Sequence, residues 1–112
     1  MVFYKGTRKR TKGKAMSDIT KDEFLKFHNG HWAFPNSTNR REYDHPAMFC
    51  EELVKRLLKL FSYKDDVILD PFNGVGTTTK VCNDLRRPYI GIDISDEYCN
   101  KARLRSQATY LL

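Results

Sequence analysis

Two short apolar runs, each ending in an aspartate, dominate the hydrophobic pattern of this chain. Val67–Asp70 comes directly before a turn with two glycines, and Tyr89–Asp93 follows further along. Because polar residues do not alternate with the apolar ones, both runs are typical of strands in a parallel sheet that is buried on both faces. The segment between them, from Thr77 or Thr78 to about Leu85, predicts a helix, and the whole unit predicts a right-handed crossover.

Apolar residues at helical spacing predict a further helix on either side of this unit. Near the N-terminus, Thr20 and Glu23 form a capping-box pattern, and Asn29-Gly30 ends the helix. A last helix follows the second strand, with Ser95 or Asp96 as its cap. The elements alternate between strand and helix, which indicates the α/β class.

A middle helix is expected to start near Pro46, because proline fits the first helical turn. Glu51 and Glu52 come early in it and basic residues come late, as the helix dipole favours. Its apolar stripe consists of Phe49, Leu53, Leu57 and Leu60, with Val54, Leu58 and Phe61 beside it. This helix must therefore cover another apolar surface.

At 112 residues, the chain has room for one domain at most. Its net charge of +6 is uneven, since residues 1–44 contain ten Lys and Arg against five Asp and Glu, and residues 45–112 contain ten against nine. The excess gathers in a run that has no acidic and no apolar residue: Lys5, Arg8, Lys9, Arg10, Lys12 and Lys14. This run predicts contacts with nucleic-acid phosphates, although a solvated basic arm would also account for it.

The cysteines point to a reducing compartment. Cys50, Cys82 and Cys99 are odd in number and lack the CxxC spacing of a zinc site, so we expect buried thiols and no metal. No apolar run is as long as a membrane span, and no secretory signal is visible. These features predict a cytoplasmic protein.

The turn between the strands predicts a ligand with a positive charge and a ribose. Gly74 and Gly76 allow a close approach of the backbone, and the helix after them offers free amides. A phosphate-binding loop would need Gly-Lys-Ser/Thr, and a dinucleotide site would need a third glycine where Thr79 stands. Asp70 would repel a pyrophosphate but attract an ammonium or sulfonium, and Asp93 can accept both hydroxyls of a ribose. S-adenosylmethionine fits both acids.

The same residues resemble a known enzyme family. The run Asp70-Pro71-Phe72-Asn73-Gly74-Val75-Gly76-Thr77-Thr78 resembles the first motif of DNA amino-methyltransferases, which methylate adenine N6 or cytosine N4. His45-Pro46-Ala47-Met48-Phe49 resembles the segment that precedes this motif in the beta class, and Gly91-Ile92-Asp93 resembles the second motif. The resemblance covers about residues 29–110 and implies part of a Rossmann-like methyltransferase fold with an incomplete sheet. It also implies a prokaryotic cell or a phage-infected host as the setting of this cytoplasmic protein.

The resemblance also implies a division of the chain and a set of site residues. Residues 1–44 would form a basic arm and linker, the tail of a target-recognition region, and residues 45–112 a half-domain that binds S-adenosylmethionine. The implied cofactor contacts are Asp70, Phe72, Asn73, Gly74, Gly76, Thr77, Asp93, His45, Pro46, Ala47 and Phe49. His45 could instead act only as a helix cap, and Phe49 only as a core residue.

The catalytic motif of the family is missing. In the family, Asp, Asn or Ser is followed by Pro-Pro and an aromatic residue that stacks on the flipped base. The four prolines of this chain, Pro35, Pro46, Pro71 and Pro88, are never adjacent. We therefore expect no catalytic residue in this chain and doubt that it methylates DNA alone.

Two hypotheses remain from different functional classes. The first is the cofactor-binding part of a DNA methyltransferase that needs a partner chain carrying the catalytic motif. The second is a non-catalytic remnant that binds duplex DNA or associates with itself through open sheet edges. Methylation of a small molecule or protein is disfavoured by the segment from His45 to Phe49. The choice between adenine and cytosine stays open.

Overall fold

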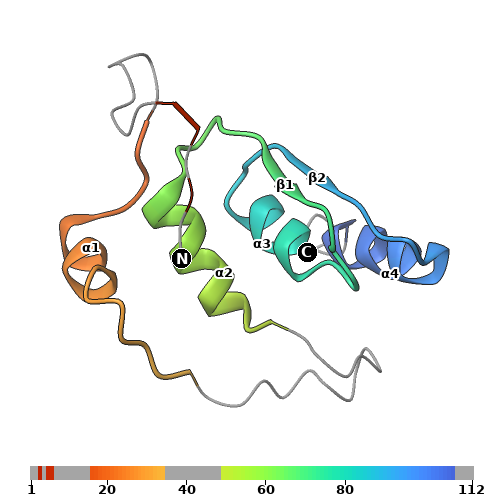
Figure 1. The fold of residues 1–112 in the computed structure, drawn as a ribbon, viewed down its shortest axis with the longest axis horizontal. Helices are drawn as coiled ribbons and strands as arrows, with labels where there is room; N and C mark the ends of the chain where they lie inside the picture. Colours follow the sequence, from red (N-terminus) through yellow and green to blue (C-terminus); the bar gives the residue numbers. More distant parts are fainter. Residues whose placement is uncertain (1–2, 4, 7–15, 35–48, 108–112) are drawn as a thin grey trace.

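The computed structural model describes residues 3, 5–6, 16–34 and 49–107. In these ranges the elements are α1 (Lys21–Phe27), α2 (Glu51–Phe61), β1 (Ile68–Asp70), α3 (Thr77–Asp84), β2 (Tyr89–Gly91) and α4 (Asp96–Gln107). Figure 1 shows α2 between α1 and α3, with β1 and β2 running side by side against α3. The boundary expected between residues 44 and 45 lies outside the described residues.

The two strands form a parallel pair, as the sequence predicted. Leu69 lies opposite Ile90, and Asp70 lies opposite Gly91. Within the described residues the sheet contains these two strands, and α3 connects them while packing against both. The predicted α/β fold, with parallel strands, flanking helices and an incomplete sheet, is therefore confirmed.

The apolar core lies where α2 and α3 meet beneath β1. Val54 and Leu58 of α2 pack against Val81 and Cys82 of α3, and Ile68 of β1 closes the cluster. Side chains buried at this level each contribute roughly 1.5–3 kcal/mol relative to exposure. This core fixes α3, and therefore the turn that precedes it, against the end of the sheet.

The start and the inner stripe of α2 differ from the sequence prediction. The helix begins at Glu51, with Cys50 extended at φ −69° and ψ 130°, so the predicted start near Pro46 is wrong. Val54 and Leu58 are the buried residues of the helix, whereas Phe49 precedes it and is exposed. The predicted apolar stripe therefore wrongly included Phe49, because Phe49 lies before the first residue of the helix.

The sheet is covered on one face only, so the expectation of burial on both faces is wrong for the described residues. Leu69 and Ile90 are neighbours across the strands and are 58% and 54% exposed. Val67 and Ile92, which have the same alternation, are also exposed. The sheet therefore presents a continuous apolar surface, Val67, Leu69, Ile90 and Ile92, which is called the open face below.

The N-terminal helix α1 is attached to the outer side of α2. Its capping box is confirmed, since the Glu23 N–H donates to Thr20 Oγ1 at 3.2 Å and the Thr20 N–H donates to Glu23 Oε2 at 3.0 Å. Lys59 of α2 donates to Glu23 at 2.6 Å, which lowers the pKa of that carboxyl. These contacts anchor α1, and its short length makes such anchoring necessary.

A single arginine organises the aromatic residues that follow α1. The guanidinium of Arg56 lies 4.9 Å from the ring centres of Phe27 and Phe34 and 5.6 Å from that of Trp32. Glu52, one turn earlier on α2, accepts from Arg56 at 2.8 Å. Trp32 therefore packs on Arg56 of α2. Within the described ranges, every helix is too short or too polar to traverse a lipid bilayer.

Candidate cofactor site

A glycine turn joins the end of β1 to the start of α3. Gly74 and Gly76 have φ angles of +53° and +84°, in the left-handed region that favours glycine. A Cβ at Gly76 would lie 2.6 Å from the Cβ of Ala102 on α4. Glycine is therefore required at Gly76 by the backbone conformation and also by the close approach of α4.

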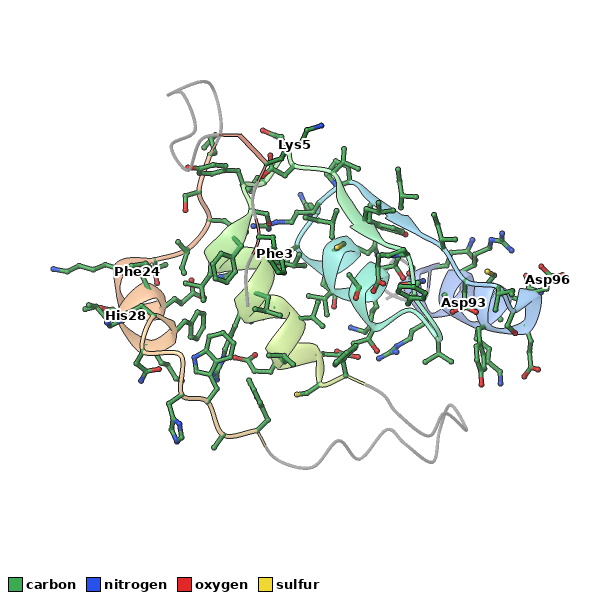
Figure 2. The ribbon with its side chains drawn as sticks, viewed as in Figure 1. Phe3, Lys5, Phe24, His28, Asp93 and Asp96 are labelled. Atoms are coloured by element: carbon green, nitrogen blue, oxygen red, sulfur yellow. The ribbon has the colours of Figure 1, made fainter. Side chains whose placement is uncertain are left out.

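Asp70 and Asp93 lie at the same end of the sheet, because they follow two parallel strands. Asp70 Oδ1 accepts from the N–H of Phe72 at 3.0 Å. Asp93 Oδ2 accepts from the N–H of Gly74 and its Oδ1 from the N–H of Ser95, both at 2.9 Å. Figure 2 shows Asp93 beside the start of α4. Since each carboxylate oxygen can accept more than one hydrogen bond, both acids retain capacity for a ligand.

Two predicted site residues direct their side chains toward the helices. The hydroxyl of Thr77 accepts from Arg105 of α4 at 3.1 Å, and Thr77 is buried. The amide of Asn73 donates to Thr79 Oγ1 at 3.3 Å beneath the turn. The first N–H groups of α3 have no partner within the helix, so the backbone here is a source of donors for a ligand.

An apolar cavity of about 270 Å³ lies between α2 and β1. Phe49, Leu57 and Leu69 form part of its apolar wall, and Asp70 and Thr78 are its polar members. The structure therefore brings together Phe49 and Asp70, which the sequence placed in one site from distant segments. Phe72, by contrast, is 88% exposed on the outside of the turn.

A second cavity of about 200 Å³ lies on the other side of the turn, between β2 and α4. Asn73, Thr79 and Gly91 line it. A Cβ at Gly91 would lie 2.6 Å from Asn73 Nδ2 and 2.7 Å from Thr79 Cγ2, so glycine lets the turn lie directly on β2. Sequence reasoning missed this role of Gly91, although a glycine inside an apolar strand signals close backbone approach.

Several predicted residues lie outside the described ranges. These are His45, Pro46 and Ala47 of the predicted cofactor segment, and Arg8, Lys9, Arg10, Lys12 and Lys14 of the basic run. Lys5 is described and exposed, and Figure 2 shows it far from Asp93. In the described ranges, no group of three or more His, Cys, Asp or Glu side chains is arranged to hold a metal ion.

Burial and ion pairing control the titratable groups behind the turn. Burial raises the pKa of the Cys82 thiol from 9.0 to about 11, so this thiol stays protonated at neutral pH. Desolvation opposes the charge of Lys80, but contacts with Asp84 at 2.6 Å and Glu51 at 3.3 Å outweigh it and raise the lysine pKa. Cys82 is therefore a protonated, unreactive thiol at neutral pH, and Lys80 keeps its charge.

Known protein families and relatives match this chain closely. A family model described as DNA methylase matches residues 1–104. The type II methyltransferase M.BglII of Bacillus subtilis is 33% identical over 97 residues, which are 85% of this chain and 27% of that relative. The orphan methyltransferase M.BamHII of Bacillus amyloliquefaciens is 39% identical over 79 residues, 66% of this chain and 30% of that relative. This chain therefore spans less than a third of either relative.

Solved structures show the same fold. The crystal structure of TTHA0409 from Thermus thermophilus, complexed with S-adenosyl-L-methionine, matches with a TM-score of 0.71 and 30% identity. That match covers 93% of this chain and 40% of TTHA0409. The M1.HpyAVI complex with S-adenosylmethionine matches with a TM-score of 0.55 and 34% identity, over 58% of this chain and 32% of that one. The likeness to TTHA0409 thus extends over nearly all of this chain, and both matches cover less than half of the neighbour.

Proposed function

Because this chain belongs to the DNA methylase family, we propose that it is the cofactor-binding part of a DNA amino-methyltransferase. The reaction is transfer of a methyl group from S-adenosylmethionine to the exocyclic amine of adenine or cytosine in duplex DNA. When bound, S-adenosylmethionine supplies an activated methyl group on a sulfonium. The residues of this chain bind and orient that cofactor.

The polar groups at the carboxyl end of the sheet suit this cofactor. Asp70 offers a carboxylate to the positive ammonium and sulfonium groups, and Asp93 offers acceptors to the ribose hydroxyls. The start of α3 offers N–H donors to the carboxylate of the methionine part. Phe49 supplies an apolar wall on the side of α2. The other proposed contacts are Phe72, Asn73, Gly74, Gly76, Thr77, His45, Pro46 and Ala47.

One observation supports the proposal above all: two carboxylates flank a left-handed glycine turn at the start of a helix. Titration calorimetry with S-adenosylmethionine tests it. Asp93→Ala is expected to weaken binding about tenfold or more, a loss of roughly 1.4 kcal/mol for each factor of ten. Asp65→Ala is the matched control, because this exposed acid lies before β1, at the other end of the strand. Equal affinity of the two variants would contradict the assignment of Asp93.

The base-binding residues are proposed to come from a second polypeptide. One fact supports this: the sequence contains no adjacent prolines, and therefore no Pro-Pro-aromatic motif. The open face adds a physical reason, since contiguous exposed apolar surface favours association. The partner would carry the Pro-Pro-aromatic motif and the target-recognition region.

A methylation assay tests the partner requirement directly. Incorporation of radiolabelled methyl groups into plasmid DNA is measured for this chain alone and together with a chain that carries the catalytic motif. The expected result is incorporation only in the mixture. Robust incorporation by this chain alone would rule out the partner requirement.

A second candidate function is binding to DNA, or association of the chain with itself, without methyl transfer. The basic run from Lys5 to Lys14 favours it, because clustered Lys and Arg bind phosphates in a salt-dependent way. Neutralising Arg8, Lys9 and Arg10 together should then abolish DNA binding. Absence of S-adenosylmethionine binding, combined with this loss, would favour the remnant over the methyltransferase.

A further inference from the structure

A buried guanidinium joins the first residues of two helices. Arg105 of α4, whose side chain is 3% exposed, donates through Nη1 to Thr77 Oγ1 at 3.1 Å and through Nη2 to Glu51 Oε1. The second carboxylate oxygen of Glu51 contacts Lys80 Nζ at 3.3 Å. Arg105 is therefore bonded at once to α2 and α3 while it belongs to α4.

The two bonded residues belong to the two segments of the proposed cofactor site. Thr77 is the first residue of α3 and follows Gly76 directly. Glu51 is the first residue of α2 and lies two positions after Phe49, which lines the apolar cavity with Asp70. Contacts through Arg105 thus relate the glycine turn to the segment on the opposite side of the cavity.

Helix α4 and the segment before it contact the turn at two further points. Ala102, one turn before Arg105, lies so close to Gly76 that a Cβ there would be 2.6 Å from its own Cβ. In the segment before α4, Asp93 accepts from the N–H groups of Gly74 and Ser95. Ala102 and Arg105 of α4 therefore contact the C-terminal end of the turn and the first residue of α3, and Asp93 contacts the middle of the turn.

Stability alone does not account for a charged group at this place. Burying the Arg105 guanidinium costs several kcal/mol, which its pairing with Glu51, whose side chain is 35% exposed, has to offset, and apolar residues of similar volume are often as stabilising. What the arginine fork adds is a fixed direction for two hydrogen bonds, which an aliphatic side chain or a lysine does not provide. The arrangement therefore points to a geometric role.

We infer that Arg105 is a positioning residue: together with Glu51 it holds the start of α2 and the start of α3 at the separation that the cofactor requires. This inference rests on the proposed function for its ligand, but the separation itself is a property of this chain. Thr77 transmits the restraint to the N–H groups at the start of α3. Loss of the fork would let the two segments move independently.

The chain offers a matched control in Arg87. Its side chain is 0% exposed, and it donates through Nη1 and Nη2 to Asp18 at 2.7 and 2.8 Å. It also donates to Ser62 at the end of α2, so it fixes the segment before α1 and does not contact the glycine turn. Arg87 and Arg105 are thus two buried, paired arginines in different places.

The test compares Arg105→Lys with Arg87→Lys in the full chain. Both variants should lower the melting temperature, because each loses one buried fork. Arg105→Lys should also weaken S-adenosylmethionine binding about tenfold or more, since small displacements of binding groups are costly. Arg87→Lys should change that affinity less than about twofold. An equal loss of affinity in both, or none in Arg105→Lys, would overturn the inference.

Two further measurements separate this inference from the proposed function. Hydrogen exchange without cofactor should rise in Arg105→Lys at Phe49–Cys50 and at Gly76–Thr79, and should stay unchanged there in Arg87→Lys. If the wild-type chain binds no cofactor but the two variants differ in hydrogen exchange in this way, the positioning role stands and the proposed function fails. Thr77→Ser should keep wild-type affinity and Thr77→Val should lose it, because only serine retains the hydroxyl; equal affinities would contradict the role of Thr77.

Discussion

The two faces of the small sheet have opposite surroundings. On the covered face, Ile68 packs into the core and Gly91 lies directly beneath Asn73 of the turn and Thr79 of α3. On the open face, Leu69 and Ile90 remain more than half exposed. Apolar residues on the covered face thus stabilise the chain itself, whereas those on the open face are not covered by any of the described residues.

This difference separates two kinds of information in one apolar strand. The covered face explains why α3 and the glycine turn have a fixed position, because the core below β1 holds them. The open face shows the limit of a two-stranded sheet. Two strands are enough to position the cofactor turn, but they are not enough to form a sheet that is covered on both faces. The proposed partner chain would complete the second face and leave the first unchanged.

The largest expected contrast is between the same substitution on the two sides. Leu58→Ala removes a buried core side chain and should lower the free energy of unfolding by about 2–5 kcal/mol. Leu69→Ala, on the open face, should cost less than about 1 kcal/mol, because its side chain is largely exposed already. Urea denaturation of the two variants measures both. Similar losses of unfolding free energy in the two variants would mean that side chains on the covered and the open side contribute equally to stability.

The glycine turn should be nearly as sensitive as the core. Gly76→Ala forces a side chain into the left-handed region and against Ala102, which together should cost about 2–4 kcal/mol. Gly6→Ala provides a control with the same sign of φ, +81°, and open space around the position. The control therefore reports backbone strain without the clash, and the excess loss in Gly76→Ala reports the support from α4.

The fold followed from the sequence where local rules decide it. The capping box at Thr20 and the two parallel strands are set by short-range chemistry and by the length of the crossover, so the pattern was sufficient. The start of α2 at Glu51 was not predictable from Pro46 alone, because a proline that suits a first helical turn does not require a helix to begin there.

The site was predictable only in part, for a physical reason. Asp70, Gly76 and Asp93 are adjacent to strand ends, so sequence position alone brings them together. Arg105 contacts the turn from a helix whose polar pattern resembles that of a solvated surface, and no local rule marks that contact. Long-range pairs of this kind depend on how the helices pack, which only the structure supplies.

The buried thiol on the covered side predicts a pH dependence of stability. The folded pKa of Cys82, about 11, exceeds its usual value of 9.0, so the unfolded chain loses this proton first as pH rises. The contribution is fully present below about pH 9 and is lost toward pH 11, and it amounts to roughly 2–3 kcal/mol. Urea denaturation between pH 8 and pH 11 should show this decline, and Cys82→Ala should flatten it. A decline of equal size in Cys82→Ala would assign it to other groups.

The smallest expected effect on stability belongs to a charge on the open face. Ile90→Lys should change the free energy of unfolding of the chain alone by less than about 1 kcal/mol, because the lysine stays in water. The same variant should nevertheless abolish methylation in the mixture with the proposed partner, since a partner surface would have to bury the charge. Leu104→Lys is the control, because Leu104 is also exposed but lies on α4, away from the open face. Partner-dependent methylation that survives Ile90→Lys would place the docking surface elsewhere. Sedimentation of the variant without the partner tests self-association through the open face separately, because the added charge should also prevent that association.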